Sequence, residues 1–196
     1  MNRSSPKSRI APLAVALAAG LSLSAMAAGA SAQDLSYNYV QGGYAATNTD
    51  GADAEGWAGE ASFAFHPNFH VFGGYNTQEI DDTNVDLDNA RIGLGYNHPI
   101  ASNTDLLARA AYENYEADEV GFDEDGWSAE VGVRSALTRN LEGYALAGYE
   151  DGDDFDGSAY GRVGAQVKFN QNWGVTGDVK FADGDTQWFV GPRYTW

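Results

Sequence analysis

The sequence predicts an all-β fold, an antiparallel up-and-down transmembrane β-barrel of ten strands that follows a cleaved signal peptide. Residues 187–196 alternate between an apolar and a polar face and end on Tyr194-Thr195-Trp196. In a soluble domain that apolar face would need a core to pack against, whereas a lipid bilayer supplies an apolar environment directly. The rest of the chain also divides into alternating runs of about ten residues, the length that a tilted strand needs to cross a membrane.

A secretory signal peptide is expected at residues 1–32. The first nine residues carry three basic side chains and no acid, and residues 10–28 form an apolar run rich in Ala and Leu. Ala30 and Ala32 then flank Ser31, which gives the small-residue pattern of a cleavage site. An uncleaved membrane anchor is the alternative. The mature protein is therefore expected to be one domain, the outer-membrane β-barrel at residues 33–196.

The composition is that of an acidic exported protein. The chain has no cysteine, so neither a lipid anchor nor a disulfide framework is available. Three of the 11 basic residues lie in the signal peptide, which leaves eight basic residues against 28 acidic ones and a net charge of −20. Because this charge repels a polyanion, no nucleic-acid partner is expected. The 25 aromatic residues argue against the disorder that acidity and 24 glycines could otherwise indicate.

Ten strands are expected, and their connections alternate between short and long. The expected strands are residues 35–46, 56–65, 69–78, 87–97, 104–115, 126–137, 140–150, 158–169, 172–182 and 186–196. Four of the short turns end at or beside an asparagine (Asn68, Asn103, Asn140 and Asn172), at spacings of 35, 37 and 32 residues. This hairpin-sized period indicates five hairpins. Eight strands are the alternative, if two of the early runs prove shorter or merged.

The alternation of short turns and long loops predicts how the barrel sits in the outer membrane. In bacterial barrels the short turns are periplasmic and the longer loops extracellular. An even number of strands then leaves both termini in the periplasm and the long acidic loops outside. A water-soluble barrel is the alternative, but it would carry apolar residues inside and polar residues outside, which is the reverse of the pattern in most of these strands.

One face of most strands is apolar and carries aromatic residues at its ends. Trp57 and Phe65, Trp173 and Phe181, and Trp188 and Trp196 are each eight residues apart. At about 3.3 Å per residue and a tilt of about 40°, this separation suits the apolar band between two aromatic girdles.

The other face carries nearly all of the basic residues, and we expect it to line the lumen. The predicted lumen charge network is Glu60, Arg91, Arg109, Glu113, Glu130, Arg134, Glu142, Arg162, Lys168, Asp178, Lys180 and Arg193. A narrow lumen can be filled by side chains, and buried charges persist when they are paired. A salt-bridged plug is therefore expected, and an anion-selective pathway along the basic residues is the alternative.

The sequence favours a non-enzymatic protein without a cofactor. His66, His70 and His98 fall at or beside the expected short turns, so no imidazole is available for general-base chemistry near the outer leaflet. The metal-ligand candidates are Asp151, Asp153, Asp154 and Asp156, whose spacing departs from a full Ca²⁺ loop.

We expect a monomer whose partners are outer-membrane lipid and lipopolysaccharide, the latter through divalent cations. The barrel assembly machinery is a further expected partner, with Tyr194 and Trp196 as the assembly signal. The expected function is a structural or cell-surface interaction role. A channel for ions or small solutes is the alternative.

Four segments carry a resemblance to a known family: residues 35–40 (LSYNYV), 71–76 (VFGGYN), 166–173 (QVKFNQNW) and 188–193 (WFVGPR). In architecture the chain resembles small Gram-negative barrels of the OmpA-membrane-domain and OmpX kind. The segments are similar to the family described as a sulfation-dependent quorum factor or activator of a plant immune receptor. That resemblance covers the mature chain and implies signalling or host perception, with a signal near Tyr37. From the residues we interpret Tyr37 as a girdle tyrosine near the periplasmic end of the first strand.

Overall fold

The structure is a computed structural model that describes residues 35–49, 53–81, 85–117, 121–153 and 157–196. The predicted signal peptide lies outside these ranges. The strands are β1 (Tyr39–Asn48), β2 (Asp53–His66), β3 (Phe69–Ile80), β4 (Asp86–Ala101), β5 (Thr104–Ala117), β6 (Phe122–Ala136), β7 (Leu141–Gly152), β8 (Ser158–Lys168), β9 (Trp173–Ala182) and β10 (Asp185–Thr195). Within the described ranges no helix is long and apolar enough to cross a membrane.

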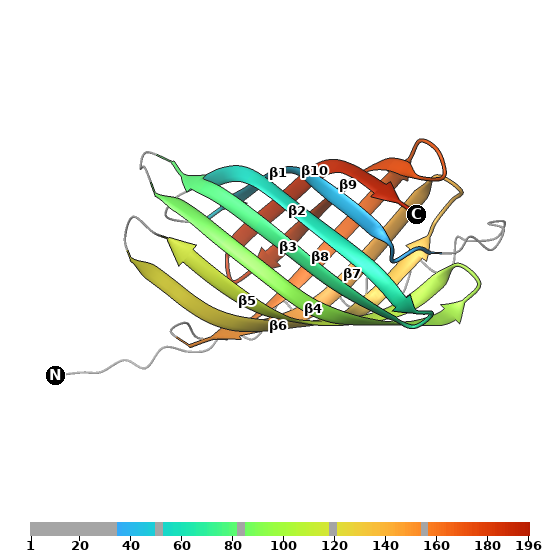
Figure 1. Ribbon diagram of the computed structural model, residues 1–196, viewed down its shortest axis with the longest axis horizontal. Helices are drawn as coiled ribbons and strands as arrows, with labels where there is room; N and C mark the ends of the chain where they lie inside the picture. The colour runs from blue at the N-terminus through green and yellow to red at the C-terminus, as the bar shows by residue number, and fades with distance from the viewer. Residues whose placement is uncertain (1–34, 50–52, 82–84, 118–120, 154–156) are drawn as a thin grey trace.

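Every strand pairs antiparallel with its neighbours in sequence, and the ends of the sheet meet (Figure 1). β10 pairs with β1, with Tyr39 opposite Thr195 and Asn48 opposite Thr186. This pairing closes the barrel and leaves no strand edge to be exposed to hydrocarbon. The predicted up-and-down barrel of ten strands is therefore confirmed, and the alternative of eight strands is excluded.

Several strands extend further toward the long loops than the sequence pattern indicated. β2 begins at Asp53 rather than residue 56, and β6 begins at Phe122 rather than residue 126. Trp57 and Trp127 consequently lie inside their strands and not at the ends. The additional residues are held by the ladder with neighbouring strands, such as Ala54 opposite Ile80. Alternating hydrophobicity stops at the edge of the apolar band, whereas backbone hydrogen bonding continues past it.

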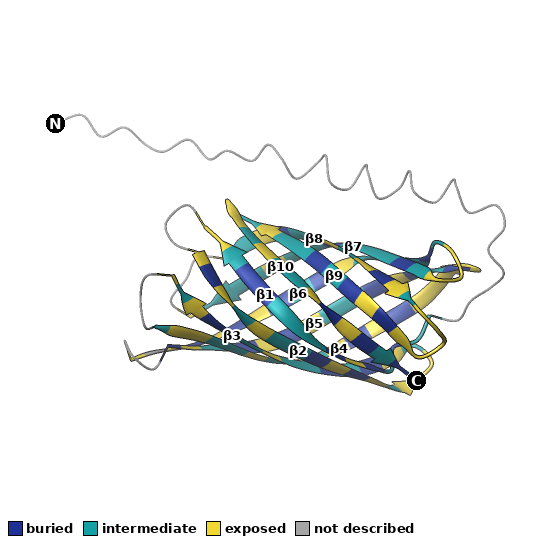
Figure 2. Cartoon of the chain, turned by 90° about the horizontal axis from the view of Figure 1, so that it is seen from above, coloured by how far each residue is buried: buried dark blue, intermediate teal, exposed yellow. Residues whose placement is uncertain are grey.

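Buried and exposed residues alternate along the strands (Figure 2). The outward positions carry large apolar side chains, and Trp57, Phe65, Trp173 and Phe181 are each at least half exposed at the barrel surface. The inward positions carry most of the buried polar and charged groups. A polar interior with an apolar exterior is the arrangement of a membrane barrel.

The four turn asparagines join each hairpin to the next one. Each asparagine side chain donates from Nδ2 to a backbone carbonyl near the short-turn end of a following strand. The pairs are Asn68 to Asn97 (2.8 Å), Asn103 to Ala136 (3.0 Å), Asn140 to Lys168 (3.0 Å) and Asn172 to Thr195 (2.8 Å). The backbone N–H of the same partner residue donates back to the carbonyl of the asparagine. This reciprocal bonding gives the regular spacing of these asparagines a structural role.

Candidate functional site

The lumen is filled at the short-turn end by the segment Leu35–Asn38, which we call the N-terminal segment. The Tyr37 side chain is only 6% exposed, and its ring stacks on the His70 ring with the centroids 4.7 Å apart. Its hydroxyl donates to Asp105 Oδ2 at 2.9 Å. Burial raises the pKa of the Tyr37 phenol, which keeps it protonated as a donor. The interpretation of Tyr37 as a girdle tyrosine is therefore wrong, because the side chain points into the barrel, where its ring and its hydroxyl both have partners.

An apolar cluster surrounds this segment inside the barrel. Tyr37 packs with the buried side chains of Leu107 and Leu146, and Leu35, Ala64 and Tyr144 border them. Gly164 lies opposite Tyr144 in the sheet, and a Cβ at Gly164 would come within 2.4 Å of the Tyr144 ring. A glycine at this position lets the ring lie flat against the opposite strand. The sequence pattern did not identify this cluster, because single leucines on a polar face carry no periodic signal.

The predicted lumen charges meet in the middle of the barrel. Glu60 of β2 forms ion pairs with Arg91 of β4 and with Arg109 of β5. The distance from Arg109 Nη2 to Glu60 Oε2 is 3.1 Å. Arg162 of β8 contacts Asp178 of β9 at 2.9 Å. Glu130 of β6 links the two groups, 3.9 Å from Arg109 and 3.7 Å from Arg162. We call the following residues the central charge network: Glu60, Arg91, Arg109, Glu130, Arg162 and Asp178.

A second group of charges lies closer to the short turns. Arg134 pairs with Glu142 at 2.6 Å, and Lys168 pairs with the same carboxylate. Arg193 differs from the others because its contacts are with neutral groups. Its Nε donates to Gln41 Oε1 at 2.7 Å, and the guanidinium lies over the Tyr39 ring, 4.2 Å from the centroid.

Two of the predicted lumen residues have surroundings that the sequence did not indicate. Lys180 pairs with Glu150 at 2.5 Å. Glu150 lies in β7, opposite Ser128, and lines the lumen. Glu113 is buried but accepts its hydrogen bonds from neutral donors, including the Tyr115 hydroxyl at 2.9 Å and Ser128 Oγ.

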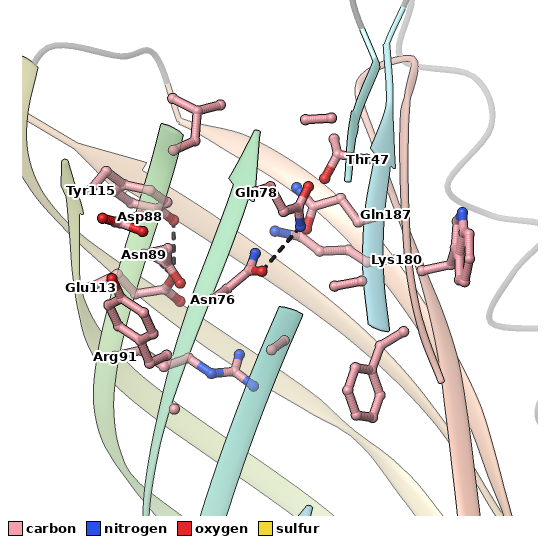
Figure 3. A pocket seen from close by; sticks show the side chains of 18 of the residues that line it. Thr47, Asn76, Gln78, Asp88, Asn89, Arg91, Glu113, Tyr115, Lys180 and Gln187 are labelled. Atoms are coloured by element: carbon pink, nitrogen blue, oxygen red, sulfur yellow. Dashed lines mark hydrogen bonds between the residues drawn. The ribbon is translucent and has the colours of Figure 1, made fainter. Parts of the chain in front are cut away.

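Above the central charge network, a cavity of about 670 Å³ extends toward the long-loop end. We call it the vestibule. Its walls include amide side chains of β3 and β4, and Arg91 lies at its inner end (Figure 3). Arg162 also lines the cavity. A separate void of about 30 Å³, bordered by Tyr37, His70 and Arg109, lies on the other side of the network. The charge network thus divides an open upper lumen from a filled lower lumen.

The outer surface near the long loops shows a repeated pairing of tyrosine with acid. The Tyr44 hydroxyl of β1 donates to Glu55 of β2, and the Tyr112 hydroxyl of β5 donates to Asp125 of β6. In both cases the acid lies diagonally across the hairpin, two residues nearer the loops than the residue directly opposite the tyrosine. These pairs place carboxylates at the loop-side edge of the apolar band.

The metal-ligand candidates do not form a site within the described residues. Asp151 and Asp153 lie at the end of β7 and just beyond it, while Asp154 and Asp156 fall outside the described ranges. No group of three or more His, Cys, Asp or Glu side chains that could hold a metal ion occurs in the part of the chain that the structure describes.

The sequence matches the family described as the outer membrane protein beta-barrel domain over residues 13–151, which is more than half of the chain. The chain belongs to this family. It is accordingly an outer-membrane β-barrel protein. A search of curated proteins finds no match.

Several solved barrels have a similar overall arrangement. The translocator domain of autotransporter NalP from Neisseria meningitidis is 12% identical, with 91% of this chain and 95% of that chain covered and a TM-score of 0.46. The KdgM porin in complex with oligogalacturonate is 13% identical, with 83% and 99% covered and a TM-score of 0.45. Ail, the attachment invasion locus protein of Yersinia pestis, is 13% identical, with 83% and 100% covered and a TM-score of 0.40. Likeness at this level carries no inference about function.

Proposed function

We propose that this outer-membrane barrel is closed to ions and solutes and serves envelope structure or interaction at the cell surface. The observation that supports this most is the central charge network, in which basic residues of β4, β5 and β8 pair with acids of β2, β6 and β9 across the lumen. Separating such buried partners is costly, at about 3–5 kcal/mol for breaking one pair. The N-terminal segment adds a second closure, because Tyr37 and the apolar cluster fill the short-turn end.

Planar-bilayer recordings of the refolded protein test this proposal. A closed lumen should give no steady single-channel steps, since the ion pairs and the packed N-terminal segment block the passage. Removing Arg162, which contacts both Asp178 and Glu130, should weaken the block and raise the frequency of openings. Arg139 is the matched control, because it is exposed in the turn between β6 and β7. Steady conductance of the unmodified protein that changes in Arg162→Ala and not in Arg139→Ala would contradict a closed barrel.

A conducting channel is the second candidate, and one observation favours it. The guanidinium of Arg193 has no acid within ion-pairing distance among the described residues, and Arg91 and Arg162 border the vestibule. In this candidate, displacement of a few lumen side chains would open a continuous passage between the vestibule and the short-turn end of the barrel. The recordings above distinguish the two candidates directly.

We further propose that the long loops face the cell exterior and that the protein contacts lipopolysaccharide through divalent cations. The outward carboxylates of Glu55 and Asp125, held by girdle tyrosines, support this proposal. They lie at the level where the apolar band ends and lipid headgroups begin. Carboxylates and lipid phosphates repel each other, and a divalent cation can bridge them. In this arrangement the short turns and the described C-terminus, Trp196, are periplasmic.

The resemblance to the quorum-factor family predicts a role in signalling or host perception. Tyr37, the tyrosine near the implied signal, is buried in the barrel. Recognition of this residue by a receptor would require the N-terminal segment to leave the lumen. The acidic loop end is therefore the surface that we favour for contact with a partner.

A further inference from the structure

The vestibule contains a buried acid that forms no ion pair with a described residue, although the charges of Arg91 and Lys180 act on it from a longer distance. Glu113 of β5 is 7% exposed and lies opposite Arg91, yet Arg91 pairs with Glu60 instead. The hydrogen bonds to Glu113 come from Tyr115, Ser128 and Asn89, all of which are neutral. Among the described residues no lysine, arginine or histidine lies within 4.0 Å of this carboxylate. A buried carboxylate gains more from a cation than from neutral donors alone.

Two buried amides in the same cavity retain unused hydrogen-bonding atoms. Gln78 of β3 is 5% exposed and donates from Nε2 to Asn76 Oδ1 at 3.2 Å, while its own amide oxygen accepts no hydrogen bond from any described residue. Gln41 of β1 is 9% exposed and accepts from Arg193, while its Nε2 donates to none of the described residues. Both side chains border the vestibule. Neither atom is among the buried side-chain atoms of the described residues that lack a hydrogen-bond partner, so both are open to the cavity, where a bound molecule can reach them.

Figure 3 shows how these groups are arranged around the cavity. Glu113, Tyr115 and Asn89 lie together on one side, Lys180 and Gln187 lie on the other, and Asn76 and Gln78 lie between them. The cavity volume of about 670 Å³ is within the range of small-molecule sites. A single metal ion held by carboxylates or imidazoles does not fit this distribution, because the described residues nowhere bring three His, Cys, Asp or Glu side chains together in a group that could hold one. An elongated molecule with a positive charge and separate hydrogen-bonding groups does fit it.

We propose that the vestibule is a binding site for a small organic amine. Its ammonium group pairs with Glu113, and a second hydrogen-bonding group reaches Gln78 on the neighbouring wall. The ligand enters from the long-loop end, and the central charge network limits its passage. This inference rests on the proposed closed barrel for one point, which is that the ligand stops in the vestibule. If the inner end were open, the same site would lie along a passage.

Isothermal titration calorimetry of the protein refolded in micelles tests the site without requiring conductance. Putrescine and spermidine are the probes, and 1,4-butanediol is the uncharged analogue of the first. We expect saturable binding of the amines and none of the diol. Glu113→Gln should weaken amine binding about tenfold or more, because a charge-assisted hydrogen bond contributes about 1.5–3 kcal/mol. Gln78→Leu should weaken it severalfold without changing any charge.

Glu79→Gln is the matched control. Glu79 is the neighbour of Gln78 on β3, but it faces outward and is exposed, so the same loss of charge should leave affinity within about twofold if only local contacts matter.

Heat-modifiable migration on gels verifies that each variant is folded, and Gln78→Leu provides the test if Glu113→Gln fails to fold. No saturable binding of either amine would overturn the site. Equal loss in Glu79→Gln and Glu113→Gln, or equal binding of the diol, would also overturn it. Because conductance is recorded separately, a barrel that conducts and still binds amine would contradict only the closed lumen.

Discussion

Among single residues, those of the N-terminal segment are held inside the lumen by hydrogen bonds to residues far away in the sequence. The Tyr37 hydroxyl is bonded to Asp105, 68 residues away, and the carbonyl of Tyr37 accepts from Ser62 Oγ at 2.7 Å. Arg134 donates to the Ser36 carbonyl at 2.8 Å and lies over the Tyr37 ring. These contacts hold a segment that precedes the first strand, and they substitute for the sheet pairing that the segment lacks.

Shortening Tyr37 should destabilise the barrel in two separable steps. Tyr37→Phe removes the donor to buried Asp105 and should lower the free energy of unfolding by about 1–3 kcal/mol. Tyr37→Ala also leaves a cavity beside Leu107 and Leu146, so its cost should be about 3–5 kcal/mol. Urea unfolding followed by tryptophan fluorescence measures both. Tyr96→Phe is the control, since Tyr96 is exposed on the outer surface, and equal costs for Tyr37→Phe and Tyr96→Phe would show that the buried hydroxyl contributes nothing.

At the scale of the secondary-structure elements, β10 is the strand on which closure depends. It pairs with β9 over residues 185–194 and with β1 at both ends of the shared ladder. The Trp196 N–H donates to the Asn38 carbonyl at 3.2 Å, and the Ser36 hydroxyl donates to the Trp196 carbonyl at 3.0 Å. The Trp196 side chain is nevertheless half exposed on the outer surface. Its backbone therefore serves the closed barrel, while its ring lies on the outer surface.

Replacing Trp196 by Ser should impair assembly more than it impairs the folded barrel. We expect protease-sensitive, non-heat-modifiable protein to accumulate in the periplasm, because the terminal aromatic is the proposed assembly signal together with Tyr194. Trp188→Ser is the matched control, since Trp188 is on the same outward face of β10 at the opposite girdle. Fractionation followed by gel migration gives the assembled fraction of each variant. If Trp196→Ser assembled at the level of the unmodified protein, Trp196 would have no role as a signal.

At the scale of the whole molecule, the charges are sorted between the lumen and the loop end. Of the eight basic residues in the range 33–196, seven face the lumen, and the eighth, Arg139, lies in a short turn. The acids outside the lumen gather mainly toward the long loops, where no basic residue of the mature sequence offsets them. Exposed like charges repel each other over distances near the Debye length, about 8 Å at physiological ionic strength. This end of the barrel is therefore expected to attract cations from the medium.

Chelation should raise the protease sensitivity of the long connections between β5 and β6 and between β7 and β8 while leaving the barrel intact. Divalent cations can bridge loop carboxylates to lipopolysaccharide phosphates, whereas monovalent salt only screens the repulsion. Limited proteolysis in lipopolysaccharide-containing bilayers, with EDTA or Ca²⁺ at matched ionic strength, measures the difference. Added NaCl should reproduce only part of the Ca²⁺ protection. Equal cleavage rates in EDTA and in Ca²⁺ would mean that the loops are simply solvated.

The class of fold, the number of strands and the sorting of side chains between lipid and lumen could be predicted from the residues alone. These are local properties, because alternation has a period of two and each hairpin repeats its turn signal, as the spacing of Asn68, Asn103 and Asn140 shows. The charged residues of the lumen, including Glu60 and Arg109, lie on the inward face that this alternation indicates.

The pairing of those charges, the extent to which the lumen is filled and the position of Tyr37 depend on the closed barrel and could not be predicted from the residues. Glu60 and Arg109 are 49 residues apart and lie on β2 and β5, and their contact depends on the stagger of the intervening strands and on closure of the barrel. The N-terminal segment enters the lumen because buried partners from several strands converge on it, which no local pattern encodes. The vestibule likewise results from the arrangement of strands in the closed barrel. Whether a lumen-facing residue borders open space or a packed neighbour is set by the register between strands, and register is a property of the closed sheet and not of any one segment.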